Sequence, residues 1–158
     1  MTEQSRTDGV VVEIDIDATP DEVFAALIEP ESVVGWWGED GDGYRCTAFR
    51  SAAHKGGRWW SEHRGKATDP VCILVGEYVE FEPPRRLSFT WEFERYTAET
   101  EALPVTTVAI DLEARDGTTH VKLTHSGFKA GSRQIEDHRG GWRSALAGLS
   151  RFVTARAA

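Results

Sequence analysis

The sequence predicts a single α+β domain in which a strongly curved antiparallel sheet, of about seven strands, wraps around a long C-terminal helix. Two observations predict the sheet and its cover. Stretches of alternating apolar and polar residues follow one another between turn residues, and an apolar stripe at helical spacing lies near the C-terminus. A third observation, a pair of short helical segments after the first strand, predicts a cap that closes one end of the sheet.

The N-terminal part predicts one strand followed by two short helices. Residues 10–17 alternate apolar and polar side chains, which is typical of a half-buried strand. Thr19 is a suitable N-cap for the next helix, and Glu22 is placed to close a capping box. A proline then restarts the chain, so a second helix is expected over 31–37. The acidic run 39–43 lacks the later oxygen ligands of a calcium loop and is interpreted as a solvated turn.

The middle of the chain predicts six more strands in antiparallel succession. The clearest alternates Leu87, Phe89, Trp91 and Phe93 with polar residues. Asp116-Gly117 is a hairpin signal, and the polar segment 95–101 is expected to be a connection. The other strands are expected over 44–50, 58–64, 71–81, 104–114 and 118–126. Glu80, beside a Pro-Pro corner, is expected to pair with Arg85 or Arg86.

The long helix is expected to begin near Ser132 and to present two kinds of inner face. Its bulky stripe consists of Trp142, Leu146, Leu149 and Val153, and its stripe of small residues consists of Gly141, Ala145 and Gly148. A glycine inside a helix costs roughly 1 kcal/mol relative to alanine. The small stripe therefore indicates either the close approach of a strand or room for a ligand.

Composition excludes several classes of function. A net charge of −8 argues against a general binder of nucleic acid or of anionic membranes. No apolar run approaches the ~20 residues that a membrane helix needs. Residues 1–9 lack the features of a secretory signal and are expected to be a disordered tail before a single domain over 10–158. A cytoplasmic location is therefore expected.

No cofactor or metal site is expected. The two cysteines form no Cys-x-x-Cys pair and are expected to be reduced thiols, and the five histidines are scattered without metal-ligand spacing. No Ser/His/Asp set and no carboxylate pair on one element is visible.

The chain resembles the START-like (SRPBCC) superfamily, and within it the family related to the C-terminal domain of the activator of the ninety-kilodalton heat-shock protein ATPase. The matching residues are, in chain order, 18–24 (Ala-Thr-Pro-Asp-Glu-Val-Phe), Trp36-Trp37, 56–59 (Gly-Gly-Arg-Trp), 76–87, Thr90-Trp91, Gly117-Thr118, 123–128 and Gly141-Trp142. The resemblance covers roughly residues 10 to 155. It implies a helix-grip fold with a cavity between the curved sheet and the long helix.

The resemblance says less about function, because the superfamily includes lipid and hormone binders, polyketide cyclases and chaperone activators. The eukaryotic activators carry a further N-terminal domain that this sequence lacks. A chaperone partner is therefore not expected from the resemblance alone.

The candidate ligand-binding residues are aromatic, polar or small side chains expected to face the cavity. If Trp59 faces inward, then Ser61 and His63 do too, since side chains alternate along a strand. His63 and His125 could orient a ligand or act as acid or base, although satisfied core histidines are commoner. The full set is Trp36, Trp37, Trp59, Ser61, His63, Phe89, Trp91, Ile110, His125, Gly141, Trp142 and Ala145.

Three functions remain open at this point. The leading one is binding of a small hydrophobic molecule, aromatic or polyketide-like, without catalysis. The second is a cyclase or hydrolase that acts on such a molecule through His63 or His125. The third is a protein-interaction module, either a chaperone regulator or a homodimer, which predicts an exposed apolar patch around Trp60 and Phe152.

Overall fold

The computed structural model describes residues 9–38, 45–65, 71–96 and 103–157. Residues 1–8 of the predicted tail, the acidic turn at 39–43 and most of the connection at 95–101 lie outside these ranges. The predicted fold class is confirmed: a seven-stranded antiparallel sheet in the order β1-β7-β6-β5-β4-β3-β2 holds one long helix, with two short helices beside it. The elements are β1 (Val10–Ile16), α2 (Pro20–Ile28), α3 (Pro30–Trp36), β2 (Arg45–Ser51), β3 (Arg58–Arg64), β4 (Val71–Glu82), β5 (Arg86–Tyr96), β6 (Thr106–Arg115), β7 (Thr118–Ser126) and α4 (Gln134–Ala157).

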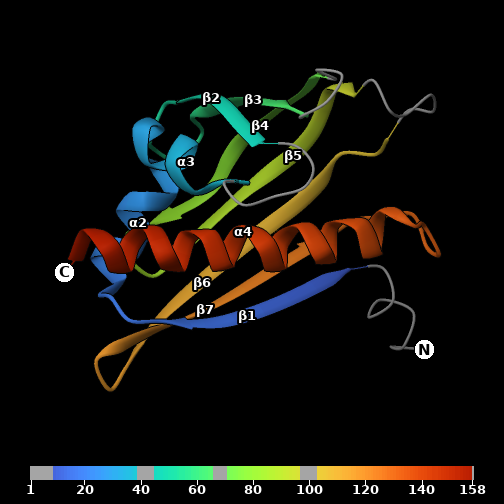
Figure 1. Cartoon of the computed structure of the whole chain (residues 1–158). Coiled ribbons are helices and arrows are strands. Elements are labelled where there is room, and N and C mark those ends of the chain that lie inside the picture. The colour runs from blue at the N-terminus through green and yellow to red at the C-terminus, as the bar shows by residue number, and fades with distance from the viewer. Residues whose placement is uncertain (1–8, 39–44, 66–70, 97–102, 158) are drawn as a thin grey trace.

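Helix α4 crosses the face of the curved sheet, and α2 and α3 lie near its C-terminal end (Figure 1). The first strand in the chain, β1, forms one edge of the sheet and β2 forms the other. Because each helix has an apolar side to bury, the space between α4 and the sheet becomes the core. Among the described helices, none is both long and apolar enough to cross a bilayer.

The capping box at the start of α2 is present as predicted. The Glu22 N–H donates to Thr19 Oγ1 at 3.2 Å, and the Thr19 N–H donates to Glu22 Oε1 at 2.8 Å. Helix α3 begins one residue earlier than expected, because Pro30 itself occupies its first turn, and it leaves Trp37 as the C-cap. The indole of Trp37 therefore follows the helix instead of belonging to its regular surface.

The strand predictions hold with small shifts. Strands β3 and β7 have the predicted bounds, and the hairpin between β6 and β7 has positive φ at Asp116 (48°) and Gly117 (86°), as a type I′ turn requires. Strand β6 begins at Thr106, two residues later than predicted from 104. Pro104 has no N–H to give to a ladder, which accounts for the later start. The predicted ion pair forms between Glu80 and Arg86, at 2.9 Å.

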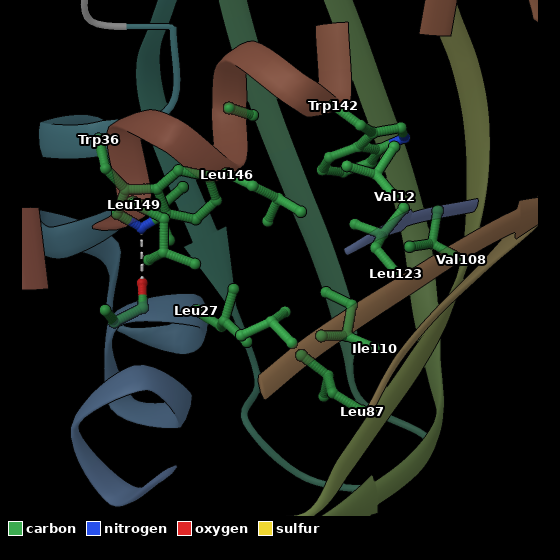
Figure 2. Close-up of a cluster of buried hydrophobic side chains, with 14 of the residues drawn as sticks. Val12, Leu27, Trp36, Leu87, Val108, Ile110, Leu123, Trp142, Leu146 and Leu149 are labelled. Atoms are coloured by element: carbon green, nitrogen blue, oxygen red, sulfur yellow. Dashed lines mark hydrogen bonds between the residues drawn. The ribbon is translucent and has the colours of Figure 1, made fainter. Parts of the chain in front are cut away.

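The bulky stripe of α4 packs into the core as predicted. Leu146 and Leu149 point from the helix toward side chains of α2 and the sheet, among them Leu27 and Ile110 (Figure 2). All four residues of the stripe, Trp142, Leu146, Leu149 and Val153, are at most 5% exposed.

The stripe of small residues does not form one inner face. Gly148 is buried, and a Cβ at this position would lie 2.6 Å from the Trp36 carbonyl oxygen, so glycine serves the close approach of α3, not of a strand. Gly141 is exposed, and a Cβ there would meet nothing within 4 Å. The prediction that Gly141 faces the cavity is wrong, because the helix turns this side toward solvent.

Candidate functional site

An apolar pocket lies between the concave face of the sheet, the short helices and α4. It receives side chains from every layer of the fold: Leu27, Val33, Trp36, Trp37, Phe49, Trp59, Tyr78, Leu87, Phe89, Ile110, Trp142 and Leu146. The space open to the centre of a water-sized sphere is about 30 Å³. Because one water needs about 10–15 Å³ on this measure, the open space has the size of about two waters. A larger ligand requires a side chain to move.

Six of the predicted binding residues line this pocket: Trp36, Trp37, Trp59, Phe89, Ile110 and Trp142. The other lining residues, such as Tyr78 and Leu146, were not predicted as site residues. Their pattern marks them as inward-facing core, and nothing in the sequence separates a core side chain that borders empty space from one that does not. Gly76 reflects this packing, because a Cβ at this strand position would overlap the Thr90 carbonyl oxygen and the indole of Trp59.

The alternation of β3 places its three inward residues as predicted. Trp59, Ser61 and His63 are buried, whereas Glu62 on the opposite side is partly exposed. Trp59 Nε1 donates to the Thr90 carbonyl at 3.2 Å, which fixes this indole against β5. Ser61 and His63 do not border the pocket. His63 packs against Trp37, with ring centroids 4.4 Å apart.

Ser61 and His63 form a buried polar pair. Ser61 Oγ lies 2.9 Å from His63 Nε2, and the two residues are 0% and 4% exposed. Burial lowers the pKa of His63 to about 4, although the nearby Glu62 carboxylate raises it in part. The imidazole is therefore neutral at pH 7, and the Ser61 hydroxyl donates to Nε2 when Nδ1 carries the ring proton.

The second predicted histidine, His125, has a structural environment. Trp142 Nε1 donates to His125 Nδ1 at 2.9 Å, so Nε2 carries the proton and donates to Thr106 Oγ1 at 2.7 Å. Thr106 in turn donates to the Trp91 carbonyl at 3.4 Å. Burial lowers the pKa of His125 to about 2. This neutral histidine joins α4, β6 and β7, and both ring nitrogens are engaged within the protein.

Two further predicted residues also lie away from the pocket lining. Trp91 is 5% exposed and packs against Trp142 at 5.2 Å between ring centroids, and its Nε1 is a buried donor without an acceptor among the described residues. Ala145 is buried on α4. The pocket therefore has an aromatic second layer that is continuous with the His125 network.

The cysteines flank His63 without forming a metal centre. Cys46 and Cys72 pair in register with His63 from the two neighbouring strands. Burial raises the pKa of each thiol to about 12, so both stay protonated at neutral pH. In the part of the chain that the structure describes, no three His, Cys, Asp or Glu residues are arranged to hold a metal ion.

Solved structures with the same fold are numerous, at low sequence identity. Protein CV1439 from Chromobacterium violaceum superposes with a TM-score of 0.79 at 20% identity, over 92% of this chain and 96% of that one. Protein NE0264 from Nitrosomonas europaea gives 0.78 at 18% identity, over 96% and 97%. The AHSA1-like protein from Aeromonas hydrophila gives 0.71 at 20% identity, over 94% of each chain. These similarities establish the fold.

The search of curated proteins finds no match to this chain. A family model does match: residues 17–154 fit the model described as "Activator of Hsp90 ATPase homolog 1-like protein". This range runs from the loop before α2 to the last turns of α4 and includes every residue of the pocket. The resemblance inferred from the sequence motifs is confirmed, and the chain belongs to the family of Activator of Hsp90 ATPase homolog 1-like proteins.

Proposed function

We propose that this protein binds a small hydrophobic molecule, aromatic or polyketide-like, between the sheet and α4. The observation that carries the proposal is the lining of the pocket, which is built almost entirely from aromatic and aliphatic side chains of five strands and three helices. Burying ~300 Å² of apolar ligand surface at ~25 cal/mol per Å² contributes about 7 kcal/mol before association costs. Such a protein would act as a carrier, a sequestering protein or a sensor.

Native mass spectrometry and thermal shift test this proposal. The freshly purified protein is expected to carry a small molecule, or to be stabilised progressively by aromatic polyketides, flavonoids or fatty acids as their concentration rises. The variant Ile110→Phe places a ring in the pocket and should abolish the shift. Val79→Phe adds the same ring at a position that is 44% exposed and should keep it. An apo mass with no shift for any compound would contradict the proposal.

One observation favours a second candidate, an enzyme acting on the same kind of molecule. The Ser61–His63 hydrogen bond has the geometry in which a histidine activates a hydroxyl nucleophile. Ester hydrolysis and ligand binding, both measured for the variants His63→Gln and Ser61→Ala, separate the two functions. Lost turnover with retained binding indicates chemistry, whereas lost affinity alone indicates an anchor for the ligand.

The two residues expected to form an exposed apolar patch in the interaction-module alternative, Trp60 and Phe152, are both partly buried. Phe152 is not an outward patch residue, because its ring packs on α3, where a Cβ at Gly35 would lie 2.7 Å from it. Trp60 is half-buried beneath the Arg50 guanidinium, 4.4 Å from its ring centroid. The large hydrophobic side chains that are exposed among the described residues are Val11, Val79 and Val105, from separate segments. Single exposed side chains of this kind do not make a docking patch.

A further inference from the structure

The indole of Trp37 fills a slot between two other tryptophans. Its ring is stacked at 19° to Trp36 on α3, with centroids 5.9 Å apart, and at 18° to Trp142 on α4, with centroids 6.1 Å apart. Trp36 and Trp142 lie at opposite ends of the core cluster in Figure 2. These separations are ordinary for offset-stacked rings. The indole of Trp37 is therefore nearly parallel to one tryptophan from each of two helices.

The indoles of Trp36 and Trp142 are anchored by hydrogen bonds, whereas the indole of Trp37 is held by ring packing alone. Trp36 Nε1 donates to the Ala26 carbonyl at 2.8 Å, and Trp142 Nε1 donates to His125 Nδ1 at 2.9 Å. No hydrogen bond of the Trp37 side chain is present within the described ranges. Trp37 is also only half-buried and occupies the C-cap of α3, with φ −81° and ψ 104°. Its side chain can rotate out of the slot without breaking a hydrogen bond of the helix.

Two ring nitrogens without a hydrogen-bond partner among the described residues lie against this slot, and one of them, Trp91 Nε1, is fully buried. The His63 ring meets the Trp37 ring edge to face, and no hydrogen bond of His63 Nδ1 occurs among the described residues. Trp91, with a centroid 5.8 Å from that of Trp37, carries the buried Nε1 donor that has no acceptor among them. A buried polar group without a partner is uncommon in a folded protein. The indole of Trp37 satisfies neither group.

We propose that the slot now filled by Trp37 is the binding site for a planar aromatic molecule bearing a hydroxyl or carbonyl group, and that Trp37 is its intramolecular competitor. This inference rests on the proposed binding function and specifies its ligand class and position. The ligand stacks between Trp36 and Trp142 after Trp37 rotates out, and its polar group faces the Ser61–His63 pair. The small volume of the pocket then follows from its being already occupied.

Removing the competitor should tighten binding. When only a fraction of the molecules has an open site, the observed dissociation constant is the intrinsic one divided by that fraction. If Trp37 is out of the slot in about a tenth of the molecules or fewer, Trp37→Ala should bind at least about tenfold more tightly. Isothermal titration calorimetry with 2-naphthol and naphthalene measures this change. Trp60→Ala, which truncates an indole outside the pocket, should leave the affinity unchanged.

A second variant covers the case in which Trp37→Ala does not fold. Trp37→Leu retains apolar volume, cannot stack, and should show the same tightening to a smaller extent. The polar half of the proposal is tested by Ser61→Ala, which should remove most of the preference for 2-naphthol over naphthalene.

The outcomes separate this inference from the proposed function. Tighter binding by both Trp37 variants supports the slot. If the native protein binds 2-naphthol and the Trp37 variants bind it equally or more weakly, then Trp37 is a wall of the site, and the inference fails while the binding function stands. If neither the native protein nor the variants bind either probe, the inference is overturned; the binding function is overturned as well only if the thermal-shift compounds also give no shift.

Discussion

At the scale of single residues, hydrogen bonds decide which polar side chains are structural. His125 receives a hydrogen bond from Trp142 and gives one to Thr106, so it has no free ring nitrogen to offer a ligand. His63 has one hydrogen-bond partner among the described residues, Ser61, and its ring packs against Trp37 of the pocket. Both histidines occupy inward-facing positions of predicted strands in the sequence. Only the hydrogen-bond partners in the folded protein show that His125 is structural and that His63 is a candidate contact for a ligand.

Replacing Thr106 by valine tests whether the hydrogen bonds of His125 stabilise the fold. The change keeps the shape of the side chain but leaves the buried Nε2 donor of His125 without its acceptor, which should cost about 1–3 kcal/mol of the free energy of unfolding. Urea denaturation measures the loss. Thr107→Val, one residue along β6 on its exposed side, is the matched control and should change stability little. Equal stability of both variants would show that the Thr106–His125 hydrogen bond contributes nothing to the free energy of unfolding.

The buried histidines also predict a pH dependence. The pKa of His63 falls from its ordinary value near 6.5 to about 4 on folding, so the unfolded chain binds a proton that the native protein does not. The contribution of neutral His63 to the free energy of unfolding is therefore fully present above pH 6.5 and decreases as the pH falls toward 4. Unfolding of His63→Gln should depend less steeply on pH in this window. His54→Gln, at an exposed turn, should keep the native slope, and an unchanged slope in His63→Gln would contradict the prediction.

At the scale of elements, local patterns predicted most of the secondary structure. The capping box, the Asp116-Gly117 hairpin and the alternation of β3 are local, and each was found where predicted. The shifts came from backbone constraints, such as the missing N–H of Pro104. The glycines of α4 could not be interpreted locally, because the reason for Gly148 lies in the Trp36 carbonyl, more than a hundred residues away in the sequence.

Two alanine substitutions in α4 test this reading of the glycines. Gly148→Ala would place a Cβ 2.6 Å from the Trp36 carbonyl oxygen, so the variant should be destabilised despite the better helix propensity of alanine. Gly141→Ala meets nothing within 4 Å and should be stabilised by about 0.5–1 kcal/mol. Thermal denaturation of the pair measures both. Stabilisation by both changes would show that α3 does not constrain the helix.

At the scale of the whole molecule, the motifs predicted the fold, the family and the position of a pocket between the sheet and α4. Half of the residues that were predicted to bind the ligand line this pocket. These positions could be predicted because inward-facing residues follow from alternation along a strand and from helical spacing. The motifs did not predict how little space is open. That depends on the packing of Trp37 against Trp36 and Trp142, residues that only the folded chain brings together.

The most direct test of binding between the sheet and α4 is a titration of the native protein with 2-naphthol, followed through the indole N–H signals of its six tryptophans by NMR. Tryptophan-to-phenylalanine variants assign the signals. The account predicts shifts for Trp36, Trp37 and Trp142 with a common saturation curve, the largest at Trp37, and none for Trp60. Saturable shifts confined to Trp60, or no shifts at any indole, would contradict it.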